Sequence, residues 1–140
     1  MKTFFNQAFT LARVSNIPTV WTNALAAWVI NSTASPTLKI IPEISDLHFF
    51  NWPTLAFLLL GSSLIYAGGC TLNDAFDQKF DQEHNPQRPI PSNSITPRTV
   101  WILGICELIT GMAILTQGAK CNIVWVLALV GSVIFYDYIH

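Results

Sequence analysis

Long apolar blocks constrain this chain more than any other feature of its sequence. A membrane-spanning helix needs about 20 mostly apolar residues, and the segment from Thr54 to Leu72 contains no charged residue. Of the 140 residues in the chain, 51% are hydrophobic and only 11% are charged, whereas soluble domains carry about 25% charged residues. So few charges cannot cover a water-exposed surface, and the sequence therefore predicts an integral membrane protein.

Three further apolar segments are long enough, or nearly long enough, to cross a membrane. We expect a single all-α membrane bundle over residues 1–140, with about four helices at 10–30, 54–84, 97–117 and 122–139. Helices are expected because a bilayer offers no water to the backbone and no segment alternates like a barrel strand. Polar residues interrupt the first segment, so we interpret it as part of the mature chain rather than as a signal peptide.

Basic residues are distributed unevenly between the two sides of this predicted bundle. One side holds Lys2, Arg13, Lys79, Arg88 and Arg98, and the other holds Lys39 and Lys120. The positive-inside rule then places both chain ends and the loop 73–96 in the cytoplasm of a multi-pass protein, of the kind found in a bacterial inner membrane. Between the first two helices we expect a short surface helix near Phe49, Phe50 and Trp52.

An acidic stretch, NDAFDQKFDQEHNPQRPIP at residues 73–91, follows the cleanest apolar segment. On a helix, Asn73, Asp77 and Asp81 are spaced i, i+4, i+8 and share one face. Oxygen ligands of this kind favour magnesium or calcium over zinc or copper. Because magnesium shares one or two carboxylates with the phosphates of a substrate, the spacing predicts a metal-diphosphate site.

Positive charges accompany these acids. Arg88 lies between closely spaced prolines, and its guanidinium can bind phosphate oxygens through two hydrogen bonds. Lys79 offers a less specific positive charge to the same substrate. Asp74 lies off the shared face and is expected to support the ligands or to lie in solvent. The competing interpretation is a solvated, charged helix end, which does not explain why the three oxygen ligands share one face.

This stretch resembles the first aspartate-rich motif of the UbiA superfamily of intramembrane prenyltransferases, whose pattern is N-x-x-x-D-x-x-x-D followed by R-P. Residues 12–28, ARVSNIPTVWTNALAAW, are similar to the first helix of that family. The resemblance covers nearly all of this chain, which corresponds to the N-terminal half of the family's fold. It implies an all-helical bundle whose cytoplasmic mouth binds a polyisoprenyl diphosphate through Mg²⁺, with the isoprenyl tail in a groove facing membrane lipid.

The resemblance also assigns roles to individual residues. Asp77, Asp81 and Arg88 are expected to be catalytic. The full set of expected site residues comprises the Mg²⁺ ligands Asn73, Asp77 and Asp81 and the substrate-binding residues Arg13, Asn73, Lys79 and Arg88.

The predicted function is transfer of an isoprenyl group from a polyisoprenyl diphosphate to an aromatic or other lipophilic acceptor. Family members carry a second aspartate-rich motif that these residues lack, so we expect the activity to be incomplete in this chain, with a second chain as a candidate to complete the bundle. The alternative is a non-catalytic membrane subunit or remnant that binds Mg-diphosphate without turnover. A CDP-alcohol phosphotransferase is disfavoured because its D-G-x-x-A-R signature is missing. The net charge of −1 gives no support to nucleic-acid binding.

Two acids lie within the later apolar segments. Glu107 is expected either to line the cavity or to contact helices that these residues do not include, because a membrane-embedded acid is costly without a polar partner. Asp137 and His140, in FYDYIH, are placed on the same side as the motif. They do not replace a second metal site.

Overall fold

The computed structural model describes residues 4–33 and 51–139, and within them the chain is helical with no strand. The helices follow one another along the chain and vary in length. They are α1 (Phe4–Leu11), the 3-10 helix η1 (Val14–Asn16), α2 (Ile17–Thr33), α3 (Trp52–Phe76), α4 (Gln78–His84), α5 (Pro97–Ala113), the π-helical segment η3 (Ile114–Gly118) and α6 (Ile123–Ile139).

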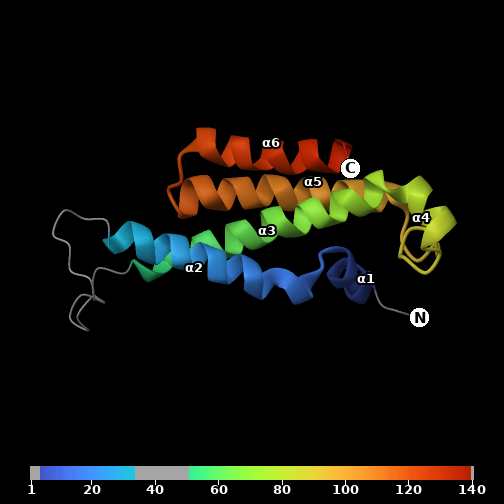
Figure 1. Cartoon of the computed structure of the whole chain (residues 1–140), viewed down its shortest axis with the longest axis horizontal. Helices are drawn as coiled ribbons and strands as arrows, with labels where there is room; N and C mark the ends of the chain where they lie inside the picture. Colours follow the sequence, from blue (N-terminus) through green and yellow to red (C-terminus); the bar gives the residue numbers. More distant parts are fainter. Residues whose placement is uncertain (1–3, 34–50, 140) are drawn as a thin grey trace.

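Helix α3 is the centre of the bundle. It contacts α5 most extensively, and it also contacts α2, α6, α1 and α4. In Figure 1, α3, α5 and α6 run along the long axis of the molecule, with α2 on the other side of α3. Helices α1 and α4 lie at the same end of the bundle. The apolar helices α2, α3, α5 and α6 therefore form the long body of the bundle, here called the shaft, and the acidic motif lies at one end of it.

Glycines allow α3 and α5 to approach each other closely. A Cβ atom added at Gly111 would lie 3.0 Å from the backbone oxygen of Gly61, and one added at Gly68 would lie 3.1 Å from that of Gly104. In a membrane, where lipid is as apolar as leucine, such close backbone approach is a main source of helix association. The core beside this contact comprises Ile65, Leu72, Leu108, Leu115, Ala119, Val126 and Val130.

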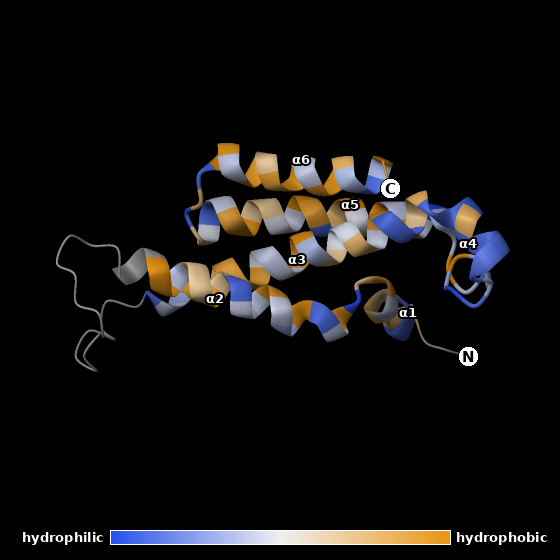
Figure 2. Cartoon of the chain, viewed as in Figure 1, coloured by the Kyte–Doolittle hydropathy of each residue, from blue (hydrophilic) through white to orange (hydrophobic). Residues whose placement is uncertain are grey.

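Two helices in the described residues are long and apolar enough to cross a membrane. They are Trp52–Phe76, which is α3, and Pro97–Gly118, which consists of α5 and η3 together. Helix α6 is equally apolar in character but shorter, with 17 residues. Figure 2 shows hydrophobic residues along the shaft and hydrophilic residues concentrated at α4. Large apolar side chains are exposed along α5 and α6, as expected for surfaces that face lipid. The predicted all-α membrane bundle is confirmed.

Two predicted helices are interrupted. The segment expected at 10–30 breaks after Leu11, where Arg13 adopts a left-handed conformation with φ 45°. The segment expected at 54–84 breaks at Asp77, whose ψ of 4° separates α3 from α4. Backbone hydrogen bonds from Asp77 N to Asn73 O and from Asp81 N to Asp77 O, both 2.9 Å, cross this second break. The helical pattern of backbone hydrogen bonds therefore continues across Asp77, although the regular helix ends there. The spacing of residues in the sequence alone could not show this break.

The other predicted boundaries agree well with the structure. Thr96 caps α5, because its side-chain oxygen accepts a hydrogen bond from Thr99 N at 3.3 Å, and Pro97 is the first helical residue. Helix α6 occupies nearly the predicted range. The surface helix expected near Phe49 and Phe50 lies outside the described residues, while Trp52 is the first residue of α3.

The glycine contact gives a stability prediction. Gly111→Ala should destabilise the bundle by about 1–3 kcal/mol, because the added methyl group would overpack against α3. Gly131→Ala is the matched control, since a Cβ there meets nothing within 4 Å; it should leave stability unchanged or raise it by up to about 1 kcal/mol. Thermal unfolding in detergent, followed by circular dichroism, would compare the two variants. Equal unfolding temperatures would contradict the proposed importance of this contact.

Candidate functional site

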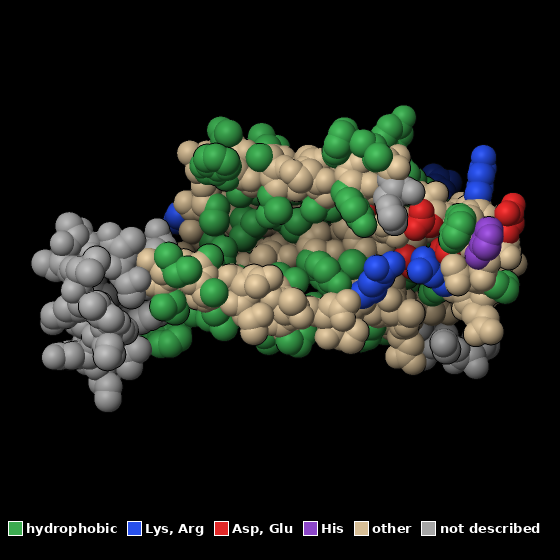
Figure 3. Space-filling model, in the orientation of Figure 1, with side chains coloured by type: hydrophobic (Ala, Val, Ile, Leu, Met, Phe, Trp, Pro, Cys, Tyr) green, Lys and Arg blue, Asp and Glu red, His purple; other side chains and the backbone are tan. Residues whose placement is uncertain are grey.

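Charged side chains gather at the end of the bundle where α4 lies (Figure 3). Four segments contribute to this cluster: the end of α3, the short helix α4, the turn after α1 and the loop 85–96. The spacing of the motif predicts that residues 73–91 meet here, and the family resemblance adds Arg13 to the expected site. The structure places Arg13, from the N-terminal part of the chain, beside Asp74.

Asn73 and Asp77 lie together on the last turn of α3. Asn73 Nδ2 donates a hydrogen bond to Asp77 Oδ2 at 2.8 Å, and both residues are partly buried. This bond leaves Asn73 Oδ1 and Asp77 Oδ1 without a hydrogen bond among the described residues. The predicted i, i+4 pairing of these two residues is therefore present, with oxygen atoms available to a ligand.

Asp81 has a different environment. Its Oδ1 accepts a hydrogen bond from Asn85 Nδ2 at 3.0 Å, and its Oδ2 accepts one from Arg88 NH1 at 2.8 Å. Asp81 is only 2% exposed. Both of its carboxylate oxygens are thus occupied by side chains of its own segment.

Asp74 connects two arginines. Its Oδ1 lies 3.2 Å from Arg88 NH1 and 3.4 Å from Arg13 NH2. Asp74 is only 7% exposed, so of the two expected roles the solvent-exposed one is wrong. It is buried because the break after α1 brings Arg13 over the end of α3. The left-handed backbone at Arg13 is sterically unfavourable for a residue with a side chain, and it allows the guanidinium to reach Asp74.

The loop that carries Arg88 is held by apolar contacts. Ile90 and Ile95 are buried with Leu11 of α1, Ala75 of α3 and Val100 of α5. These side chains fix the loop against three helices. Arg88 is therefore fixed in two ways. The loop that carries it packs against three helices, and its guanidinium pairs with Asp74 and Asp81.

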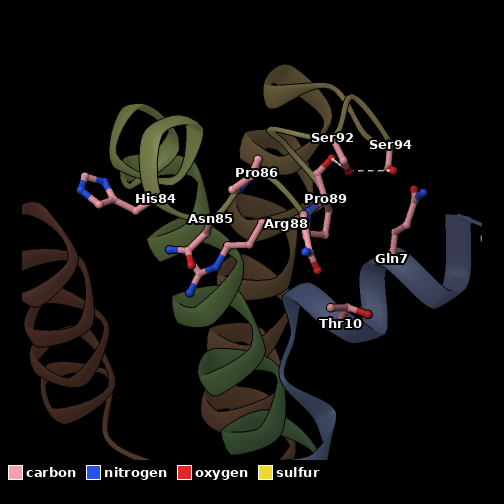
Figure 4. Close-up of a pocket in the computed structure, with 10 residues that line it drawn as sticks. Gln7, Thr10, His84, Asn85, Pro86, Arg88, Pro89, Ser92 and Ser94 are labelled. Carbon is pink, nitrogen blue, oxygen red and sulfur yellow. Dashed lines mark hydrogen bonds between the residues drawn. The ribbon is translucent and has the colours of Figure 1, made fainter.

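Two cavities beside the cluster are lined by residues of the motif region. The larger, of about 450 Å³, lies between α1 and the loop; Figure 4 shows Gln7 and Thr10 from α1 on one side of it and Arg88, with Ser92 and Ser94, on the loop side. The second, of about 310 Å³, is open, and its polar lining residues are Arg13, Tyr66, Cys70, Asn73, Ser132, Tyr136 and Asp137. Arg88 and Asn73 thus face different cavities.

Sequence reasoning missed some members of this site. Asn85 continues the spacing of the motif by another four residues, so periodicity could have indicated it. Gln7 is buried at the larger cavity, and no local signal marks it, because α1 reaches the loop only through the tertiary fold. Lys79, a predicted substrate-binding residue, is exposed and forms no ion pair in the part of the chain that the structure describes.

Glu107 is part of the contact between the two long helices. Thr71 Oγ1 of α3 donates a hydrogen bond to Glu107 Oε2 of α5 at 2.9 Å. The half-buried carboxylate therefore has a partner within the described chain. Its polar contact is to α3, so a partner from further helices is not needed to explain an acid at this depth.

The donor set at the end of α3 suits a hard divalent cation. Asn73 and Asp77 present oxygen atoms, which magnesium and calcium prefer. The described residues contain no ready-made group of three histidine, cysteine, aspartate or glutamate side chains around one point. Such a sparse arrangement is typical of magnesium, which keeps several waters and shares substrate phosphates rather than occupying a complete protein cage.

Comparison with known proteins gives a family match over most of the chain. The model of the UbiA prenyltransferase family matches residues 44–140. No solved structure gives a significant match.

Curated relatives are enzymes of several kinds. A 4-hydroxybenzoate octaprenyltransferase of Polaromonas sp. is 31% identical over 124 residues, which are 82% of this chain and 42% of the relative. A digeranylgeranylglyceryl phosphate synthase of Methanococcus aeolicus is 30% identical over 92 residues, 64% of this chain and 32% of the relative. A protoheme IX farnesyltransferase of Alkalihalophilus pseudofirmus is 34% identical over 64 residues, 44% of this chain and 20% of the relative. The chain therefore spans less than half the length of these relatives.

The environment of Asp81 gives a second prediction. Asp81→Ala should destabilise the folded chain by about 1–3 kcal/mol, because the buried hydrogen bonds to Arg88 and Asn85 would be lost. Glu83→Ala, at an exposed position of α4, is the control and should have little effect. Thermal unfolding in detergent is the measurement. Equal stability of the two variants would show that the Asp81 contacts contribute nothing to folding.

Proposed function

The chain belongs to the UbiA prenyltransferase family, and from this premise we propose that it binds a polyisoprenyl diphosphate and takes part in transferring the isoprenyl group to an aromatic or other lipophilic acceptor. The similarity to relatives that use different acceptors supports the class of reaction and leaves the acceptor unspecified. Transfer breaks the carbon–oxygen bond to the diphosphate and forms a bond from the same carbon to the acceptor, which loses a proton.

The observation that carries this proposal is the cluster at the end of α3. Two arginines, Arg13 and Arg88, lie beside Asp74, and the available oxygens of Asn73 and Asp77 are nearby in sequence and on the same helix end. Below them the bundle is apolar. A ligand with a diphosphate head and a hydrocarbon tail matches this arrangement, in which a polar surface at the end of the bundle adjoins an apolar surface along it.

Magnesium is the proposed cofactor. The motif assigns it to Asn73, Asp77 and Asp81, of which Asn73 and Asp77 have the more available oxygens. When bound, it would supply positive charge that neutralises the diphosphate as a leaving group. The sparse protein donor set leaves coordination positions for phosphate oxygens.

Arg88 would bind the diphosphate directly. Its side chain is 36% exposed, whereas Asp74 and Asp81 are almost completely covered. The two carboxylates hold the guanidinium in place while part of it stays accessible, and the planar group can donate two parallel hydrogen bonds to phosphate. Arg13, with 43% of its side chain exposed, would add a second positive charge. Lys79 would contribute only at longer range.

The bundle would hold the isoprenyl tail and keep water from the reacting carbon. Apolar side chains exposed on α5 and α6 would contact lipid or the tail itself. We place the charged end in the cytoplasm, following the excess of basic residues on that side, in a bacterial inner membrane. A second chain or further helices would supply the second aspartate-rich motif that these 140 residues do not contain.

A second candidate function rests on the same cluster at the end of α3. In it, the chain is a membrane subunit that binds Mg-diphosphate and does not catalyse transfer. Both functions require the same binding site, so they differ only in turnover.

The test is retention of radiolabelled farnesyl diphosphate by the purified chain in lipid nanodiscs. Retention should require Mg²⁺, should be lost in Asp77→Asn, and should fall in Arg88→Lys because an ammonium cannot reproduce the two-pronged contact. Glu83→Gln is the control and should retain the ligand.

Two outcomes separate the possibilities. Equal retention with and without Mg²⁺ would contradict a metal-diphosphate site. Magnesium-dependent retention without any prenylated product, when 4-hydroxybenzoate and other lipophilic acceptors are supplied, would favour the non-catalytic subunit.

A further inference from the structure

A buried carboxylate at the end of α6 has no role in the site described so far. Asp137 is only 7% exposed, and its Oδ2 atom is buried without a hydrogen-bond partner among residues 4–33 and 51–139. A buried carboxylate oxygen in this state is costly, since it has lost water and gained nothing in exchange. A neutral side chain at this position would cost less free energy to bury.

Asp137 lies at the same cavity as the end of α3. The open cavity of about 310 Å³ is lined by Asn73 from one side and Asp137 from another, with Arg13 beside them. Asp77 lies next to this cavity, because its Oδ2 accepts a hydrogen bond from the cavity-lining Asn73 at 2.8 Å. The tertiary fold therefore brings the end of α3 and the carboxylate of α6 to one cavity, although about 60 residues separate them in the sequence.

Arg13 does not satisfy this carboxylate through an ion pair. The ion pair that the structure gives Arg13 is to Asp74 Oδ1, at 3.4 Å. Asp77 is hydrogen-bonded to the cavity-lining Asn73 and carries the same sign of charge as Asp137, and two neighbouring carboxylates repel each other unless a cation lies between them. A divalent cation would both satisfy the buried oxygen and relieve this repulsion.

The motif's own third acid is poorly placed to provide the missing ligand. Asp81 already accepts hydrogen bonds on both oxygens, at 3.0 Å from Asn85 and 2.8 Å from Arg88. Using it as a ligand would place a cation beside the guanidinium of Arg88, which lies 2.8 Å from Oδ2, at a residue that is only 2% exposed. Asp137 Oδ2 has no hydrogen-bond partner of this kind among the described residues.

We propose that Asn73, Asp77 and Asp137 together hold the divalent cation, and that Asp81 acts through Arg88, which it positions. This inference rests on the proposed function, because it concerns the cation that the diphosphate would share. It adds a ligand from α6 that lies outside the aspartate-rich motif.

The experiment is a titration of the chain in lipid nanodiscs with Mn²⁺, which replaces Mg²⁺ and is detected by electron paramagnetic resonance, with and without inorganic pyrophosphate. Asp137→Gln should weaken Mn²⁺ binding about tenfold or more, on the scale expected when a metal site loses a group it depends on. Asp137→Glu is the matched comparison, because it has the same size as the glutamine variant and keeps the charge; it should bind Mn²⁺ more tightly. Glu83→Gln should bind as the unaltered chain does.

The outcomes distinguish this inference from the proposed function. If Asp77→Asn abolishes Mn²⁺ binding while Asp137→Gln and Asp137→Glu bind equally well, the Asp137 ligand is wrong and the proposed function stands. If the unaltered chain does not bind Mn²⁺ even with pyrophosphate, both are wrong. Circular dichroism of each variant shows whether the helices form, and the glutamine–glutamate comparison separates loss of charge from loss of fold.

Discussion

Asp74 is the residue on which the arrangement of the charged end depends. Its buried carboxylate lies between Arg13 and Arg88, at 3.4 and 3.2 Å, and so joins the turn after α1, the end of α3 and the loop before α5. An acid buried this deeply is stabilised by its positively charged partners, because a buried carboxylate without a partner is costly. The two arginines in turn remain partly exposed, so the same contacts that fold this end also leave positive charge available to a phosphate ligand.

The shaft and the charged end follow different physical rules. Along the shaft, α3 and α5 associate through glycine contacts and a small apolar core, and one hydrogen bond, from Thr71 to Glu107, joins them at 2.9 Å. At the end, charge pairs and hydrogen bonds at Asp74 and Asp81 are added to the apolar contacts that hold the loop. The boundary between these regions falls near the last turn of α3, which is where an amphiphilic diphosphate would change from polar head to hydrocarbon tail.

Much of the fold could be predicted from the amino-acid sequence, because membrane spans and helix caps are local features. The long uncharged block predicted α3, and Thr96 with Pro97 predicted the start of α5. The breaks at Arg13 and Asp77 were not readable. Each is a change of one or two backbone angles, and helical periodicity carries no information about such angles. The contact of Arg13 with Asp74, 61 residues away, is likewise absent from any local pattern. The same reason explains why Asp74, off the predicted face, was not recognised as a buried residue.

The sequence by itself determined the class of protein, the apolar helices and the row of Asn73, Asp77 and Asp81, because each depends only on composition and on spacing along a helix. The tertiary structure alone decided which of these oxygens stay available. Arg88 and Asn85 occupy Asp81, while Asp137 arrives from α6 with an unpaired oxygen. Spacing fixes which side chains share a helix face, but only the folding of the loop and of α6 against α3 fixes what those side chains meet.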